Sequence, residues 1–456
     1  MRVFDFLFVY EIKSRELETI CLLKYELERR GYTVKIAETW QHNFRPFRPI
    51  NAKVCVVFAL YDDGQIQYFF NFATEIKKIV NLYWEQIFNN AEENDNLSSH
   101  VVRDYAKMGV HLCWGDKSVR RLLDEYLVPC QNIFRIGHIA YDFFRPQLTE
   151  YFMTRDDVLR KYNICVEKKV LLFISSFAFI GMPDSTLNTP LYQNCGFDPF
   201  KFRNISEKSQ AAILGWFQSA LIDNPDYEII YRPHPAEVGS ELLVIMQNEN
   251  RNFHVLTDFS VKQWIFIADK VCTWISTSIA EVYAASKGCS ILRPFAIPYE
   301  ADIPIYSNAS FISDYESFIS SLLHPNDEQS IDPAILHEYY YQDDKVPSYM
   351  LACSVLENVL RNDQYSSDCF EQLRPMKLKK RNGARRVLGR ILNRTLMILL
   401  RTEFGQRITS KFLRSASFMI NERIFAIKMA RKNYASESEI TSIQKRIATT
   451  LKYNSK

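Results

Sequence analysis

The chain has 456 residues, of which 47% are hydrophobic, 24% charged and 14% aromatic, and its formal net charge is +3. This balance is typical of a folded globular protein and excludes a disordered one, and the length predicts two or three domains. No apolar run reaches the 18 or so residues that a membrane-spanning helix needs, and the first residues lack the order of a secretory signal, so we expect a cytosolic protein.

Strands and helices alternate along the first third of the chain. Apolar runs predict strands at residues 3–10, 33–37, 54–60, 79–84, 110–114 and 133–136. Between them, amphipathic segments predict helices at 14–30, 66–78, 101–108 and 117–127. Strands separated by helices predict a parallel sheet covered on both faces.

After Arg145-Pro146 the same alternation begins again. It predicts strands at 170–175, 228–231, 253–256, 270–275 and 290–292, with helices at 209–222, 240–247, 261–268 and 279–287. The fold class is therefore α/β, with two doubly wound Rossmann-type domains that face a cleft. We expect domains at residues 1–148 and 149–345 and a helical, basic extension at 346–456.

The extension concentrates the positive charge of the chain. Residues 371–456 hold 21 Lys and Arg against 5 Asp and Glu, whereas the other residues hold 35 against 48. Within 385–399, arginines alternate with leucine, isoleucine and valine, which predicts an amphipathic helix. This helix either lies on an anionic membrane surface or packs its apolar stripe on the body. Nucleic-acid binding is disfavoured because no recognition module is visible.

Cysteine and glycine usage excludes several classes of protein. The ten cysteines contain no CxxC pair, and Cys55, Cys113, Cys165 and Cys272 fall in apolar runs that read as buried strands. No GxGxxG or GxxxxGK[ST] motif occurs, and the eight histidines lack ligand spacing. We therefore expect reduced thiols, no metal site, no bound cofactor, and neither a Rossmann dehydrogenase nor a Walker NTPase.

Two strand ends of the second domain carry groups suited to phosphate. Arg232 and His234 follow one predicted strand, within Tyr-Arg-Pro-His-Pro, and offer a guanidinium and a directed imidazole. A second strand leads into Ser276, Thr277 and Ser278 and then a helix that carries Glu281. Because ligands of open parallel sheets bind at the carboxyl ends of strands, we expect these residues to bind a nucleotide donor. Each of these residues also has a structural alternative. His234 could be hydrogen-bonded to a backbone carbonyl, residues 276–278 could be an ordinary helix cap, and Glu281 could be a solvated helical residue.

Acidic residues follow two strands of the first domain. Asp62-Asp63-Gly64 follows one, and Glu85 directly follows another. Glu85, flanked by Trp84 and Gln86, is expected to have a raised pKa and to act as the base, with Asp63 ranked second. The alternative for the Asp-Asp-Gly sequence is a surface turn. His138 and Asp142, near the domain boundary, are interpreted as structural.

These residues together resemble a known family. The motifs occur in the order seen in bacterial surface-carbohydrate biosynthesis proteins, which resemble glycosyltransferases of the GT-B architecture. The motifs are Arg15-Glu16-Leu17, Gly115, Gly137 with residues 142–146, residues 231–235, and residues 276–278 with Glu281 and Gly288. The resemblance covers residues 1–345. It also extends to polyol-phosphate transferases of teichoic acid synthesis and to transferases that use CMP-activated sugars.

The resemblance implies roles for individual residues. In those relatives the histidine of the His-Pro motif contacts the donor phosphate and the Ser/Thr element completes the site, which implies His234 and residues 276–278 here. Polyol-phosphate transferases carry a histidine base where this sequence has Glu85, and that departure favours sugar transfer. Bacterial sialyltransferases bear an acidic pair before glycine, as at residues 62–64.

The resemblance implies a metal-independent glycosyltransferase. The protein would move a sugar from a nucleotide-activated donor, CMP-linked sugars included, to a surface polysaccharide such as capsule or lipopolysaccharide, or to a lipid-linked precursor. We expect the first domain to bind acceptor, the second to bind donor, and the tail to hold the protein at the inner face of the cytoplasmic membrane. The alternatives are a CDP-polyol phosphotransferase, a nucleotide-sugar 2-epimerase and a non-catalytic docking protein.

Overall fold

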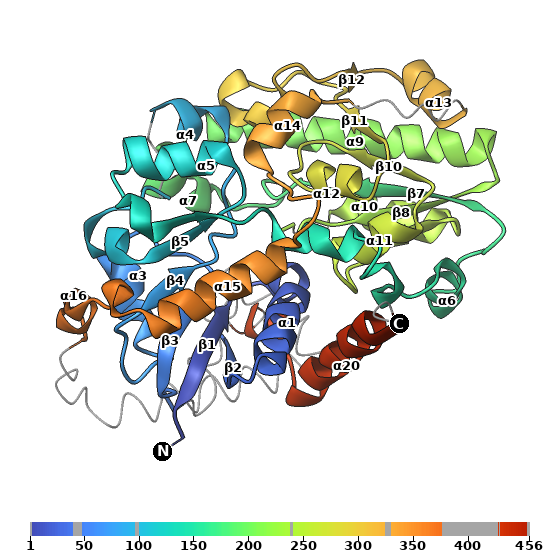
Figure 1. Ribbon diagram of the computed structural model, residues 1–456. Coiled ribbons are helices and arrows are strands. Elements are labelled where there is room, and N and C mark those ends of the chain that lie inside the picture. Colours follow the sequence, from blue (N-terminus) through green and yellow to red (C-terminus); the bar gives the residue numbers. More distant parts are fainter. Residues whose placement is uncertain are drawn as a thin grey trace, which may run out of the picture.

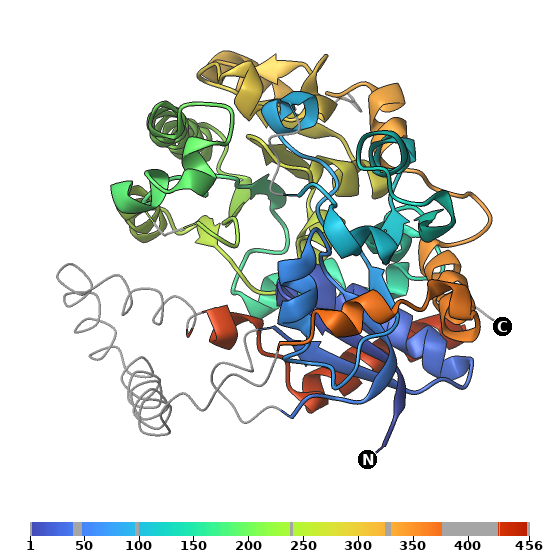
Figure 2. The same ribbon diagram turned by 90° about the vertical axis from the view of Figure 1, so that its left-hand side faces the viewer.

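The computed structural model describes residues 2–39, 48–95, 100–237, 240–323, 330–375, 427 and 429–453. Each half of the chain builds its own parallel sheet, the first drawn in blue to cyan and the second in green to yellow (Figures 1 and 2). The strand order of the first sheet is β2-β1-β3-β4-β5-β6, and that of the second is β12-β11-β10-β7-β8-β9.

The first sheet consists of β1 (Phe4–Tyr10), β2 (Val34–Glu38), β3 (Ala52–Val57), β4 (Ile79–Asn81), β5 (Val110–Cys113) and β6 (Ile133–Arg135). Alternate residues of its central strands enter two different cores. Phe6 and Phe8 pack on the face that carries α1 (Lys13–Arg29), whereas Leu7 and Val9 pack on the face that carries α3 (Asp63–Phe69). The sheet is therefore buried on both sides, as continuous apolar strands predict.

The second sheet consists of β7 (Lys169–Ile174), β8 (Tyr227–Arg232), β9 (Phe253–Val255), β10 (Lys270–Thr273), β11 (Cys289–Leu292) and β12 (Phe311–Ile312). Its chain order reverses between β7 and β10, which are hydrogen-bonded neighbours. Open α/β sheets bind their ligands at such a reversal, beyond the carboxyl ends of the strands. Residues 175–176, 233–237 and 274–278 follow β7, β8 and β10 and so meet at this edge.

The principal helices around the sheets are α5 (Asp116–Arg120), α6 (Arg155–Lys161), α9 (Pro199–Asp223), α10 (Glu241–Glu249), α11 (Val261–Ile267), α12 (Ile279–Ala284), α13 (Tyr315–Leu323) and α14 (Pro333–Tyr339). The α15 helix (Ser348–Arg361) then crosses back to the first sheet and packs on α1 and β3 (Figure 1). Asp142, although far away in the sequence, caps the start of α15, because its carboxylate accepts hydrogen bonds from the backbone N–H groups of Ser348 (3.1 Å) and Tyr349 (2.7 Å). This contact confirms the structural interpretation of Asp142.

Several predicted elements differ in length or type. The strand expected at 79–84 ends at Asn81, because the Asn81 side chain accepts the Tyr83 N–H (2.9 Å) and Tyr83 turns into the left-handed region with φ of 53°. The helix expected at 66–78 ends at Phe69, and the one at 101–108 is a 3₁₀ segment, Asp104–Met108. The prediction of a buried Cys165 is wrong, since this residue is exposed.

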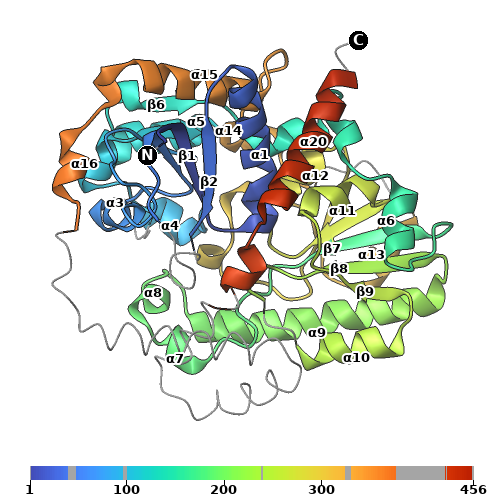
Figure 3. The same cartoon turned by 90° about the horizontal axis from the view of Figure 1, so that it is seen from below.

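The end of the chain packs against the body. The α20 helix (Glu437–Tyr453) lies alongside α1, and its apolar residues Ile440 and Ile447 join the core beneath it (Figure 3). The expectation of a helical extension therefore holds for this last stretch. The Arg-rich segment at 385–399 lies outside the described residues. Within the described part of the chain, no helix has the length and apolar character needed to cross a membrane.

Truncation of the Ile447 side chain tests this packing. Ile447 is fully buried, so Ile447→Ala is expected to lower the free energy of unfolding by about 2–5 kcal/mol through lost burial and the cavity it leaves. Thr449→Ala, an exposed change on the same helix, should have little effect. Urea unfolding monitored by circular dichroism measures both values. Equal stability of the two variants would show that α20 does not dock in solution.

Candidate functional site

The loop after β8 holds His234 in a defined orientation. The backbone N–H of Ala236 donates to His234 Nδ1 (3.1 Å), which assigns the proton of the neutral ring to Nε2. Burial by the surrounding protein, together with the charges of Arg15 and Lys432, lowers the pKa of His234 to about 4, against an opposing effect of Glu85. The imidazole is nevertheless exposed to solvent. At neutral pH the ring offers a directed N–H donor.

Glu237 anchors this loop, and sequence analysis missed it. Its carboxylate accepts hydrogen bonds from Ser175 Oγ (2.5 Å), Tyr231 OH (2.7 Å), Gln210 Nε2 (3.2 Å) and the backbone N–H of His234 (3.1 Å). Burial raises the pKa of Glu237, and these hydrogen bonds oppose that shift. The only signal in the sequence is a carboxylate three residues after the histidine of a strand-end loop.

A network of charges from the first domain acts on the same histidine. Arg15, in the first turn of α1, donates to Glu85 Oε1 (2.8 Å) and to the buried Glu16 (2.7 Å). His100 Nε2 lies 3.2 Å from Glu85. The charges of Arg15 and Glu85 also act on His234, so two of the predicted catalytic residues, Glu85 and His234, interact electrostatically.

The predicted raised pKa of Glu85 is wrong. Burial would raise this pKa, but the hydrogen bond from His100 and the charge of Arg15 outweigh burial and hold it well below the usual range. Glu85 is therefore ionised at neutral pH and is a weak base in this state. The sequence did not reveal this because His100 and Arg15 lie in other segments of the chain.

His100 makes the stability of the fold depend on pH. Burial alone would lower its pKa, but hydrogen bonds to Glu85 and Glu92 raise it to about 9 from an unfolded value near 6.5. The stability that His100 contributes is therefore fully present below about pH 6.5 and is lost as the pH rises through about 9. Urea midpoints measured from pH 6 to 10 should fall more steeply for the wild type than for His100→Gln. Parallel profiles would contradict the ion pairs.

Asp63 and Arg232 have partners within their own domains. Asp63 Oδ1 accepts the N–H of Tyr105 (3.0 Å), and Asp62 caps α3 and pairs with Arg103 (2.9 Å). These contacts agree with the interpretation of the acidic pair as a turn. Arg232 is buried, and its guanidinium donates to the carbonyls of Leu256, Asp258 and Phe259, contrary to the predicted phosphate contact. Burial lowers its pKa to about 10.

The Ser/Thr element lies at the carboxyl end of β10, which β7 separates from β8 in the sheet. Tyr306 OH contacts both the N–H (3.0 Å) and the carbonyl (2.8 Å) of Ser276, which fixes the start of the turn. The Ser278 N–H donates to Ser276 Oγ (3.2 Å), and Thr277 is exposed. Burial raises the pKa of Glu281 against the charge of Lys262 and a hydrogen bond from Ser278.

An interdomain contact joins the Lys262 region to the first domain. Lys262 lies 3.3 Å from Glu18 of α1, and Ser260 Oγ and Tyr151 OH also donate to Glu18 (2.6 and 2.9 Å).

His138 is buried against the rings of Trp114 and Tyr141, and burial lowers its pKa to about 3. The position of His138 agrees with its structural interpretation.

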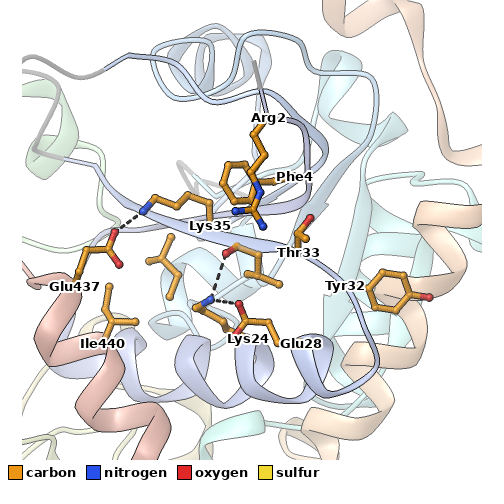
Figure 4. Close-up of a pocket in the computed structure, with 11 residues that line it drawn as sticks. Arg2, Phe4, Lys24, Glu28, Tyr32, Thr33, Lys35, Glu437 and Ile440 are labelled. Carbon is orange, nitrogen blue, oxygen red and sulfur yellow. Dashed lines mark hydrogen bonds and ion pairs between the residues drawn. The ribbon is translucent and has the colours of Figure 1, made fainter.

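A separate cavity of about 480 Å³ opens between α1, α20 and the start of β1 and β2 (Figure 4). Its lysines are already paired, Lys24 with Glu28 and Lys35 with Glu437. The cavity lies at the amino ends of the strands, away from His234, and we assign it no ligand. Among the described residues, no group of three or more His, Cys, Asp and Glu side chains is arranged to hold a metal ion.

Comparison with known proteins addresses the fold. No family model and no curated protein matches the sequence. Among solved structures, the wall teichoic acid polymerase TagF is similar at 11% identity and a TM-score of 0.50, over 78% of this chain and 89% of that one. A TagF variant soaked with CDPG has a TM-score of 0.51 at 11% identity, over 78% and 88%. A UDP-GlcNAc 2-epimerase from Neisseria meningitidis bound to UDP-GlcNAc has a TM-score of 0.49 at 12% identity, over 79% of this chain and 100% of that one.

At these identities the likeness to TagF establishes the fold alone. Two six-stranded parallel sheets with helices on their faces form a two-domain α/β architecture of the GT-B kind. The predicted fold class is confirmed, including a helix at the end of the chain.

Proposed function

We propose that this protein is an enzyme of surface-carbohydrate biosynthesis that transfers a sugar from a nucleotide-activated donor to a glycan or lipid-linked acceptor. The observation that carries the proposal is His234, a neutral imidazole whose Nε2–H is directed by the Ala236 contact at a ligand-binding sheet edge. Its position opposite the Arg15–Glu85 pair of the first domain supports a site shared by both domains.

In this proposal the second domain binds the donor. His234 Nε2–H donates to the donor phosphate, and Ser276, Thr277 and Ser278 supply hydroxyl and backbone N–H groups beside it. Glu281 supports this turn through Ser278. As the bond between sugar carbon and phosphate oxygen breaks, negative charge develops on the phosphate, and a fixed N–H donor stabilises it. Arg232, with its donors turned inward, holds the loop that precedes α11.

The acceptor would approach from the first domain. Its hydroxyl oxygen forms the new bond to the sugar carbon and loses its proton to a carboxylate. Glu85 is a carboxylate that acts electrostatically on His234, and its low pKa means that it takes the proton only once that bond has begun to form. Asp63 remains the second candidate. The basic C-terminal extension at 346–456 is proposed to associate with an anionic membrane surface at the cytoplasmic face.

A second candidate is transfer of a polyol phosphate from a CDP-activated donor. The structure places His100 against Glu85, so a histidine does stand beside the position where such transferases carry one. His100 is protonated at neutral pH, which disfavours it as a base and leaves sugar transfer as our first choice.

Product analysis separates these functions. Purified protein is incubated with nucleotide-activated sugars or with CDP-glycerol and a lipid-linked acceptor, and the products are followed by phosphorus NMR and mass spectrometry. Our proposal predicts released nucleotide and an acceptor that gains a sugar but no phosphorus. An acceptor that gains phosphorus identifies polyol-phosphate transfer, and a donor converted to its C2 epimer without an acceptor identifies an epimerase. A folded protein that converts no donor favours the docking alternative.

A further inference from the structure

The chain returns to the predicted donor site just before α20. Asn433 is buried at the carboxyl end of β1, where its carbonyl accepts Tyr10 OH (2.7 Å) and its side-chain oxygen accepts the backbone N–H of Lys13 (2.9 Å). Residues 429–433 are helical. This segment is therefore fixed to the first domain at the start of α1, two residues from Arg15.

The residue before this anchor reaches the loop of the second domain. Lys432 Nζ donates to the carbonyl of Pro235 (2.7 Å), the residue that follows His234. An ammonium group has three N–H donors, and Pro235 accepts one of them. Lys432 is otherwise exposed and forms no ion pair with a carboxylate among the described residues. One side chain of the C-terminal segment thus joins the two domains at His234.

The charges around His234 are arranged for an anion. Arg15 and Lys432 both lower the pKa of His234, and Lys432 in turn has a lowered pKa through burial and the charge of Arg232. Neighbouring cations repel one another, which disfavours the charged form of each, whereas a bound phosphate would be attracted to all of them. Glu16 and Glu85 already compensate Arg15. Lys432 is the cation at this site that a ligand would compensate.

We propose that Lys432 is a phosphate-binding residue of the donor site, so that the C-terminal segment completes a site where the described cations of the two domains, Arg15 and Arg232, already have partners. The ligand class is a nucleoside mono- or diphosphate whose phosphate lies between Lys432 Nζ and His234 Nε2. This inference rests on the proposed function because it concerns the same site.

Binding of pyrophosphate, CDP, UDP and the parent nucleosides tests the inference by calorimetry. Lys432→Gln is expected to weaken binding of the phosphate-containing ligands at least 10-fold and to leave nucleoside binding unchanged. Lys432→Arg should restore most of the affinity because the charge is retained. Lys445→Gln, an exposed change on α20, is the matched control and should bind as the wild type does.

A second measurement, made without a ligand, tests whether Lys432 lies close to His234. Removal of the Lys432 charge should raise the pKa of His234, measured by NMR titration of the imidazole proton signals, whereas Lys445→Gln should not. If wild type and Lys432→Gln bind pyrophosphate equally while His234→Ala loses binding, the inference is wrong and the proposed function stands. If the wild type binds neither pyrophosphate nor either nucleotide, both are wrong.

Discussion

His234→Ala is expected to reduce nucleotide-dependent turnover by roughly 10²–10³-fold, the usual cost of removing one directed hydrogen-bond donor from a developing negative charge. The protein should remain folded, because His234 is exposed and, among the described residues, its ring accepts only the Ala236 N–H. Initial rates of nucleotide release at saturating donor measure the effect, and the melting temperature checks the fold.

His337→Ala provides the control for this prediction. His337 is exposed near the end of α14, so its removal should change neither rate nor stability. If a folded His234→Ala protein retains the wild-type rate, the histidine does not contact the reacting phosphate.

Glu237→Ala is expected to have the largest effect on stability near the site. The change removes the common acceptor of Ser175, Tyr231 and Gln210, which are buried. Ser175 and Gln210 keep their contacts with Tyr231 OH, but at least one buried donor is left unsatisfied, at a cost of about 1–3 kcal/mol, and the bonds to a charged acceptor are lost as well. We therefore expect a loss on the order of 3 kcal/mol in the free energy of unfolding. Because His234 loses its backbone partner as well, pyrophosphate binding should also weaken.

Urea unfolding and pyrophosphate calorimetry measure both consequences. Glu237→Gln keeps one side-chain oxygen as acceptor and should lie between the wild type and Glu237→Ala. Glu249→Ala, at the exposed end of α10, is the control. Wild-type stability and wild-type pyrophosphate affinity in Glu237→Ala would show that the carboxylate does not hold the loop.

Local patterns were sufficient to predict the two sheets. Continuous apolar strands separated by amphipathic helices predicted the α/β class, and strand-end position identified Glu85 after β4 and His234 after β8 as candidates. The two-residue strand β12 was not predicted, because two residues carry no periodicity. The early end of β4 depended on a side-chain contact of Asn81.

The electrostatics of the site could not be predicted from local sequence. The pKa of Glu85 is set by Arg15 and His100, which come from the first helix and from a loop. The guanidinium of Arg232 is turned inward by three carbonyls that follow β9. Lys432 reaches the carbonyl of Pro235, the residue after His234, from the far end of the chain. Residue spacing and composition do not predict such contacts between segments that lie far apart in the sequence.

Equilibrium binding of CMP, CDP, UDP, GDP and ADP to the wild type and to His234→Ala tests the central claim most directly. A ligand that binds only the folded state at 100 times its Kd adds about 2.7 kcal/mol to the free energy of unfolding, which thermal unfolding detects. We predict that at least one of these nucleotides stabilises the wild type and that His234→Ala loses this stabilisation. If no nucleotide stabilises the wild type, or if His234→Ala is stabilised equally, the claim that this loop forms a nucleotide-donor site is contradicted.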